Sequence, residues 1–129
     1  KKLMKMEKKN CKALIVEDDP DITTLLTYIL KKEGFTVTSV SDGETALSIV
    51  NEFKPDVVLL DLMLPKINGF EVCHRIKENI KTKDIKIVVV SAKNYHADIN
   101  RAKKLGADEY LVKPFAKEDL IKILNSFHN

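Results

Sequence analysis

The chain has 129 residues, of which 44% are hydrophobic, enough for one core without disulfides or structural metal but too few for a second globular domain. The net charge of +3 is uneven, because the first twelve residues hold six lysines and Glu7 while the remainder is mildly acidic. No apolar run approaches the roughly 20 residues that span a bilayer, and no apolar stretch typical of an export signal follows the N-terminal charges.

These features predict a cytoplasmic protein that does not enter membranes, with residues 1–11 as a flexible basic tail and residues 12–129 as one folded domain. Cys11 and Cys73 do not have the spacing of a disulfide framework or a zinc site, so we expect reduced thiols.

From Lys12 onward, short runs of aliphatic and β-branched residues alternate with longer segments of helical period. The five strand-like runs cover residues 13–16, 35–40, 56–60, 85–90 and 109–112. Three of them are continuously apolar, as expected for strands that helices cover on both faces, whereas residues 35–40 alternate and suit an edge strand.

In the longer segments, apolar residues recur at helical spacing and predict one buried stripe per helix. The stripes comprise Ile22, Leu25, Leu26, Ile29 and Leu30; Ala46, Leu47, Val50 and Phe53; Val72, Cys73, Ile76 and Ile80; Ile99, Ala102 and Leu105; and Leu120, Leu124 and Phe127. Gly34 is expected to end the first helix. The alternation predicts an α/β fold, a doubly wound five-stranded parallel sheet of the flavodoxin-like (βα)5 type with strand order 2-1-3-4-5. The last helix reaches about the last residue, so we expect no output domain in this chain.

Polar residues follow four of the strands, on what a parallel sheet makes one shared edge. They are Glu17, Asp18 and Asp19 after the first strand, Asp61 after the third, Ser91 after the fourth and Lys113 after the fifth. Clustered carboxylates repel one another unless a cation lies among them, and an all-oxygen ligand set favours Mg²⁺. A carboxylate can also act as a nucleophile and form an aspartyl phosphate, with a lysine and a hydroxyl holding phosphoryl oxygens.

Each of these residues alone has a simpler explanation. Asp19 or Asp21, ahead of Ile22, can be an N-cap of the following helix, and one lysine before a proline is unremarkable. Four strands that end in acid, acid, hydroxyl and lysine are much harder to explain in this way, so the sequence favours phosphoryl chemistry.

The same residues lie within four motifs that resemble those of the CheY-like receiver domains of bacterial two-component response regulators. The motifs are LIVEDDP at residues 14–20, LLDLMLPKINGFEV at 59–72, VVVSAK at 88–93 and GADEYLVKPF at 106–115. Asp18 precedes Asp61 by 43 residues, while Ser91 and Lys113 follow it by 30 and 52 residues, in the family's order and spacing. The resemblance extends from about Lys12 to Phe127.

The resemblance implies a signalling switch that accepts a phosphoryl group on Asp61 from a histidine kinase or phosphotransfer protein that carries a phosphohistidine. Glu17, Asp18, Asp61 and the backbone carbonyl of Met63 would hold Mg²⁺. Glu17 stands where many members have Asp, which favours a water-mediated contact with the ion. Met63 offers no polar side chain near the phosphoryl group. The domain would assist its own phosphorylation and dephosphorylation without being an enzyme for a free substrate.

The resemblance also implies that Lys113 contacts the phosphoryl group, that Ser91 bonds to it after transfer, and that Tyr110 then turns from exposed to buried. The peptide bond between Lys113 and Pro114 is usually cis in the family. A downstream protein would bind the face formed by the fourth helix, the fifth strand and the fifth helix, and no direct binding of nucleic acid by this domain is expected.

On this output face, Ile99 and Ile123 occupy positions where paired charges are common in DNA-binding members, and Asn100 and Lys103 stand where an apolar patch is common. Exposed isoleucines would indicate a surface for another protein, whereas isoleucines that pack inward would be structural. We expect a monomer before phosphorylation.

Three other functions share parts of this pattern. A phosphohydrolase of the haloacid dehalogenase type would place a second Asp two residues after the nucleophile, where this chain has Met63. A nucleotide-binding domain would need a glycine-rich phosphate loop, and no such motif occurs. A phosphorylation-silent receiver that acts only as a docking module remains the alternative.

Overall fold

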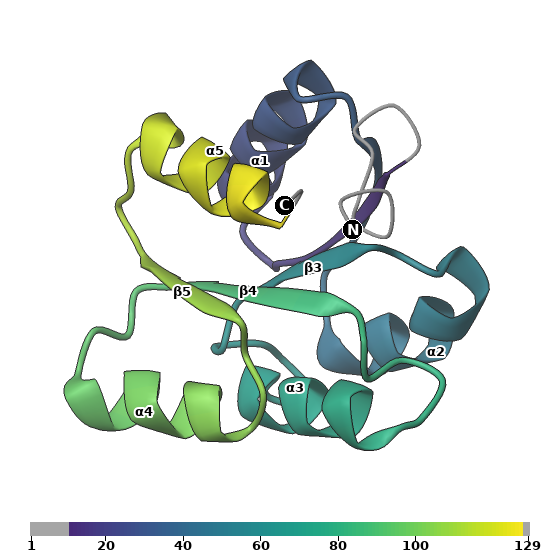
Figure 1. The fold of residues 1–129 in the computed structure, drawn as a ribbon. Helices are drawn as coiled ribbons and strands as arrows, with labels where there is room; N and C mark the ends of the chain where they lie inside the picture. The colour runs from purple at the N-terminus through teal and green to yellow at the C-terminus, as the bar shows by residue number, and fades with distance from the viewer. Residues whose placement is uncertain (1–10, 128–129) are drawn as a thin grey trace.

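The computed structural model describes residues 11–127, so the predicted basic tail lies outside the described residues except for Cys11. The elements are β1 (Lys12–Val16), α1 (Pro20–Lys32), β2 (Thr36–Val40), α2 (Gly43–Phe53), β3 (Val57–Leu60), α3 (Gly69–Glu78), β4 (Lys86–Ser91), α4 (His96–Lys104), β5 (Glu109–Val112) and α5 (Lys117–Ser126). The strands form one parallel sheet in the order β2-β1-β3-β4-β5 (Figure 1), which confirms the predicted doubly wound, flavodoxin-like fold.

The sheet separates two helical layers, with α1 and α5 on one face and α2, α3 and α4 on the other (Figure 1). Successive residues of a strand point to opposite faces. Ile15 and Leu59 therefore pack toward α1 and α5, while Leu14 and Leu60 pack toward α2 and α3. Within residues 11–127, none of the helices has both the length and the apolar character that crossing a membrane requires.

Helix α1 begins and ends where the sequence predicts. The Asp19 side chain is its N-cap and accepts hydrogen bonds from the backbone N–H groups of Asp21 and Ile22. Gly34, two residues after Lys32, adopts a φ of 93°, a conformation that glycine enters without a steric penalty. Asp19 is thus the N-cap of α1, the structural role that the sequence also allows for it.

Two residues assigned to buried stripes are exposed. Leu25 is 43% exposed, because it lies at the border of the buried face of α1. Ile80 is 81% exposed, because α3 ends at Glu78 and Asn79 is extended, so that helical spacing no longer applies. The prediction was therefore wrong for Ile80 in both secondary structure and burial.

Both cysteines are buried, and neither forms a disulfide. Burial raises the pKa of the Cys73 thiol to about 11, which suppresses the reactive thiolate. The Cys11 carbonyl accepts a hydrogen bond from the Thr36 backbone at 2.9 Å. The packed core therefore begins one residue before the boundary expected from the sequence.

Candidate functional site

Four strands deliver polar side chains to one edge of the sheet. Val16 of β1 lies opposite Leu60 of β3, so that the next residues, Glu17 and Asp61, emerge together. Ser91, the last residue of β4, pairs with Val112 of β5, which directly precedes Lys113. The fold thus gathers side chains that lie up to 96 residues apart in the sequence.

Glu17, Asp18 and Asp61 form an acidic cluster in which one carboxylate oxygen from each lies within 4.8 Å of the others. Glu17 and Asp61 are buried, whereas Asp18 is exposed. The all-oxygen donor set of this cluster fits a hard divalent cation such as Mg²⁺. Met63 contributes its backbone N–H, which donates to Asp61 Oδ1 at 3.1 Å, and its side chain is exposed.

The ammonium group of Lys113 lies between two members of the acidic cluster. Its Nζ atom is 2.8 Å from Glu17 Oε1 and 3.2 Å from Asp61 Oδ2. Burial raises the pKa of Glu17 and outweighs the opposing hydrogen bond from Lys113. Burial by itself would lower the pKa of Lys113, but its bond to Glu17 and the charges of both carboxylates raise it overall. The lysine is therefore held protonated beside both buried carboxylates.

The backbone around Asp61 fixes the position of this carboxylate. The Asp61 N–H donates to the Val16 carbonyl at 3.0 Å, which ties β3 to β1 at the edge of the sheet. The chain then returns to the same point, because the Gly69 N–H donates to the Leu62 carbonyl at 2.9 Å. A Cβ atom on Gly69 would overlap the Asp61 carbonyl oxygen. The absence of a side chain at Gly69 therefore allows α3 to begin against the segment that carries Asp61.

Ser91 and Tyr110 are linked through the backbone of Lys93. Ser91 is fully buried, and its Oγ accepts a hydrogen bond from the Lys93 N–H at 3.3 Å. Tyr110 is half-buried, and its hydroxyl donates to the Lys93 carbonyl at 2.7 Å. Burial raises the pKa of the Tyr110 hydroxyl. The sequence indicated Ser91 and Tyr110 but not the backbone group that both contact.

The remaining predicted residues lie on α4, α5 and the loop after β5. The Lys113–Pro114 peptide bond is cis. Ile123 is half-buried and packs against the core under α1 and α5, so the inward-packing explanation holds for this residue. Ile99 is also half-buried. Tyr95, the N-cap residue of α4, is 75% exposed and was not singled out from the sequence.

Comparison with known proteins identifies relatives of the whole described fold. Residues 13–125 match the family model of the response regulator receiver domain. The chain is 41% identical over 108 residues to the DNA-binding response regulator MtrA of Mycolicibacterium smegmatis, and 40% identical over 111 residues to the alkaline phosphatase synthesis transcriptional regulatory protein PhoP of Bacillus subtilis. These alignments cover 84% and 86% of this chain but 46% and 45% of the relatives, so the chain spans about half of their length.

Solved structures agree with this assignment. A putative response regulator from Chloroflexus aurantiacus gives a TM-score of 0.88 at 29% identity, over 93% of this chain and 98% of that one. The receiver domain of the sensor histidine kinase PA1611 from Pseudomonas aeruginosa, with a magnesium ion coordinated in its active site cleft, gives 0.84 at 28% identity, over 92% and 98%. The family model, the relatives and the strand-edge cluster of carboxylates and lysine together show that this chain belongs to the response regulator receiver domains of two-component signalling.

Proposed function

We propose that this domain accepts a phosphoryl group on Asp61 from a phosphohistidine donor, on a histidine kinase or phosphotransfer protein, in a magnesium-dependent reaction. The observation that carries the proposal is the setting of the Asp61 carboxylate. It lies at the end of a central strand, within 4.8 Å of Glu17 and Asp18 oxygens, with the Lys113 ammonium 3.2 Å from Oδ2. The proposed nucleophile, the acidic pair and the positive charge of Lys113 therefore lie together at one edge of the sheet.

In the proposed transfer, a carboxylate oxygen of Asp61 attacks the phosphorus atom of the phosphohistidine. A P–O bond forms, the P–N bond breaks, and the donor imidazole leaves with the electron pair and takes a proton from solvent. An ionised carboxylate needs no general base. Lys113 supplies positive charge to the phosphoryl oxygens, and the Ser91 hydroxyl donates to one of them after transfer.

Glu17, Asp18, Asp61 and the Met63 carbonyl would hold Mg²⁺, which offsets negative charge on the phosphoryl oxygens when bound. Glu17 has both carboxylate oxygens engaged, Oε1 by Lys113 at 2.8 Å and Oε2 by the Asp19 N–H at 3.0 Å. This arrangement supports a water-mediated contact between Glu17 and the ion. Asp18, which is exposed, is the better candidate for direct ligation.

The domain acts in this proposal as a switch, because the aspartyl phosphate is formed and hydrolysed on the protein rather than released as a product. The alternative is a phosphorylation-silent docking module. Intact-protein mass spectrometry after incubation with acetyl phosphate and Mg²⁺ separates the two. The wild type should gain one phosphoryl group and Asp61→Asn should gain none. The control variant, Asp56→Asn, should gain one phosphoryl group as the wild type does. An unlabelled wild type would favour the docking module, and equal labelling of wild type and Asp61→Asn would move the acceptor elsewhere.

The signal would leave through the face formed by α4, β5 and α5, to another protein. Tyr110 of β5 is half-buried beside Ser91 and contacts Lys93 at the start of the loop to α4, so a change at Ser91 can reach this face directly. The domain should be a monomer in sedimentation experiments before activation and with beryllofluoride, a phosphoryl mimic. A tight dimer that forms only with the mimic, and that charge reversal at Asp119 or Lys122 abolishes, would contradict this proposal.

A further inference from the structure

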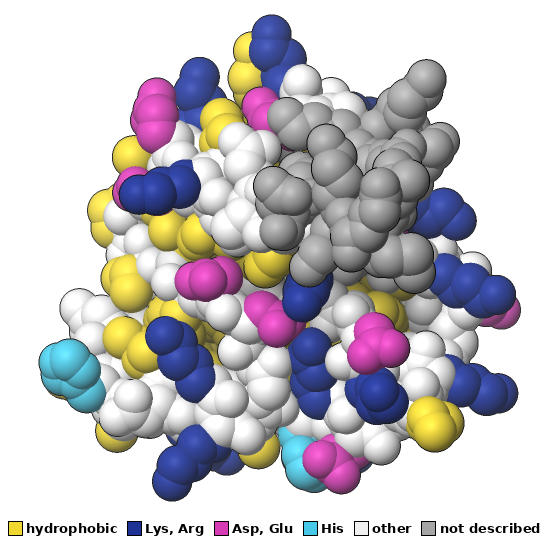
Figure 2. All heavy atoms as spheres, viewed as in Figure 1, with side chains coloured by type: hydrophobic (Ala, Val, Ile, Leu, Met, Phe, Trp, Pro, Cys, Tyr) yellow, Lys and Arg dark blue, Asp and Glu magenta, His cyan; other side chains and the backbone are white. Residues whose placement is uncertain are grey.

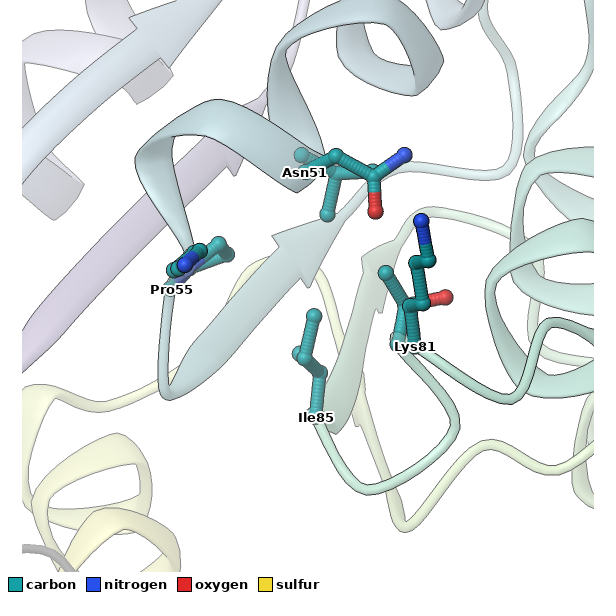
Figure 3. A pocket seen from close by; sticks show the side chains of 7 residues that line it. Asn51, Pro55, Lys81 and Ile85 are labelled. Carbon is teal, nitrogen blue, oxygen red and sulfur yellow. The ribbon is translucent and has the colours of Figure 1, made fainter.

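A cavity of about 650 Å³ lies at the amino-terminal ends of β3 and β4, across the sheet from the edge that carries Asp61. It opens between the end of α2 and the turn that connects α3 to β4 (Figure 3). Its lining residues are Val50, Asn51, Lys54, Pro55, Lys81, Thr82 and Ile85. The volume lies within the roughly 300–1,000 Å³ typical of pockets for small molecules.

The cavity has an apolar floor. Val50, Pro55 and Thr82 are buried, and Ile85 is half-buried. The Thr82 hydroxyl donates to the Ile76 carbonyl at 2.7 Å, so the hydrogen bond that this buried hydroxyl can donate is already made within the protein. An apolar body placed on this floor would be removed from water on several sides.

The rim of the cavity is polar and positively charged. Asn51, Lys54 and Lys81 are exposed, and Figure 3 shows the side chains of Asn51 and Lys81 reaching toward each other across the opening. Among the described residues that line the cavity, none carries a carboxylate. The rim therefore favours an anion.

The backbone at Lys54 gives a second reason to assign a role to this rim. Lys54 is the C-cap of α2 and has a φ of 52°, a left-handed conformation that is unfavourable for a residue with a Cβ atom. Glycine is the usual residue in this conformation at a helix end, and a residue before proline is further biased toward extended backbone. Lys54 therefore places a positive charge on the cavity rim at a position where glycine would be less strained.

The wall formed by the α3–β4 turn is preformed. The N–H groups of Thr82 and Lys83 both donate to the Asn79 carbonyl, at 3.0 and 2.8 Å. The Lys77 ammonium donates to the carbonyls of Lys83 and Ile85, at 3.2 and 2.7 Å. A ligand would therefore meet an ordered turn and would not have to order it on binding.

We infer that this cavity binds a small organic acid with an aromatic or branched aliphatic body. The body lies on the floor formed by Val50, Pro55 and Ile85, and the carboxylate lies between Lys54 and Lys81. Among the described residues that line the cavity, none belongs to the Asp61 site, so the ligand would not contact Asp61.

Titration of the ¹⁵N-labelled protein, followed by two-dimensional NMR, tests the inference with 4-phenylbutyrate as probe and its neutral amide as the matched control. The acid should produce saturable shifts at the amides of Asn51, Lys54, Thr82 and Ile85. The neutral amide should bind about fivefold more weakly, since an exposed ion pair contributes up to about a factor of five. Equal affinity for acid and amide, shifts confined to other faces, or no saturable shift would overturn the inference.

Four variants test whether the acid binds in this cavity. Lys81→Glu should weaken binding of the acid at least about fivefold, whereas Lys83→Glu, the same charge change on the same turn but outside the cavity, should not. Lys54→Gly should weaken binding while the melting temperature stays equal or rises, because glycine relieves the backbone at this position. Asp61→Asn should bind as the wild type does. If Lys81→Glu and Lys83→Glu lost the same affinity for the acid, binding would depend only on the general charge of the surface, and the inference would be overturned.

Discussion

Lys113 lies nearer to Glu17, at 2.8 Å from Oε1, than to Asp61, at 3.2 Å from Oδ2. The lysine is thus shared between Glu17 and the proposed acceptor. The face of the molecule drawn in Figure 2 carries basic and acidic side chains interspersed with small apolar areas. The buried arrangement of Lys113 with two carboxylates is what distinguishes the site from those exposed charges.

The raised pKa of Glu17 predicts how stability depends on pH. The folded state holds the Glu17 proton more tightly than the unfolded state, so this stabilisation is present below the ordinary value of 4.5 and is lost as pH rises through the folded value. Glu17→Gln cannot ionise. It should melt like the wild type near about pH 4 and at a higher temperature near about pH 7, measured by calorimetry without metal.

Glu52→Gln, which alters an exposed carboxylate on α2, provides the control and should melt like the wild type at both pH values. A lower melting temperature of Glu17→Gln at neutral pH would mean that the bond to Lys113 outweighs the burial of Glu17.

The acidic cluster predicts a thermal response to Mg²⁺. An ion that binds only the folded state raises the melting temperature. Asp18→Ala should remove most of this rise, because Asp18 supplies one carboxylate of the cluster. Asp84→Ala removes a carboxylate whose side chain is almost fully exposed and should keep the full rise. An undiminished response in Asp18→Ala would place the ion elsewhere.

The close approach at Gly69 predicts a large effect from one methyl group. In Gly69→Ala the new Cβ would overlap the Asp61 carbonyl oxygen and the Leu62 backbone, neither of which can rotate away. We expect a loss of about 1–3 kcal/mol in the free energy of unfolding, measured with urea. A loss below about 0.5 kcal/mol would show that α3 can move away from the acceptor segment without penalty.

The hydrogen bond from Tyr110 to the Lys93 carbonyl predicts a smaller, specific effect. Tyr110→Phe should lower the free energy of unfolding by about 0.5–1.5 kcal/mol, because it removes the donor of a 2.7 Å bond. Phosphorylation of Asp61 should be unchanged, since the Tyr110 hydroxyl donates to the Lys93 carbonyl and not to the Asp61 carboxylate. Tyr95→Phe, at an exposed aromatic on the same face, should change stability by less than about 0.5 kcal/mol. Equal changes in the free energy of unfolding of the two variants would mean that the hydrogen bond to Lys93 adds nothing measurable to stability.

Much of the fold follows from the sequence, because continuous apolar runs and helical stripes differ in period and alternate strictly. The end of α3 did not follow, since Ile80 keeps helical spacing although the chain leaves the helix after Glu78. The residues of the acidic cluster were identified from their positions after strands. The preference of Lys113 for Glu17 was not, because it depends on distances between side chains that no local pattern encodes.

The contact between Tyr110 and Lys93 could not be predicted from the sequence for a different reason. The acceptor is a backbone carbonyl, which every residue has, so the identity of Lys93 carries no signal. The cavity near Lys54 and Lys81 likewise combines two turns that are far apart in the sequence.

Strand β3 is hydrogen-bonded to β1 on one side and to β4 on the other, and all four of its residues are buried. Its amide protons should exchange with solvent only when the whole domain unfolds, whereas those of the loop between β4 and α4 should exchange through smaller, local openings. Asp61 follows β3 directly and is thus attached to the strand whose amide protons we expect to exchange most slowly. A phosphoryl donor would therefore approach a stationary target, and the structural response would travel through the loops around it.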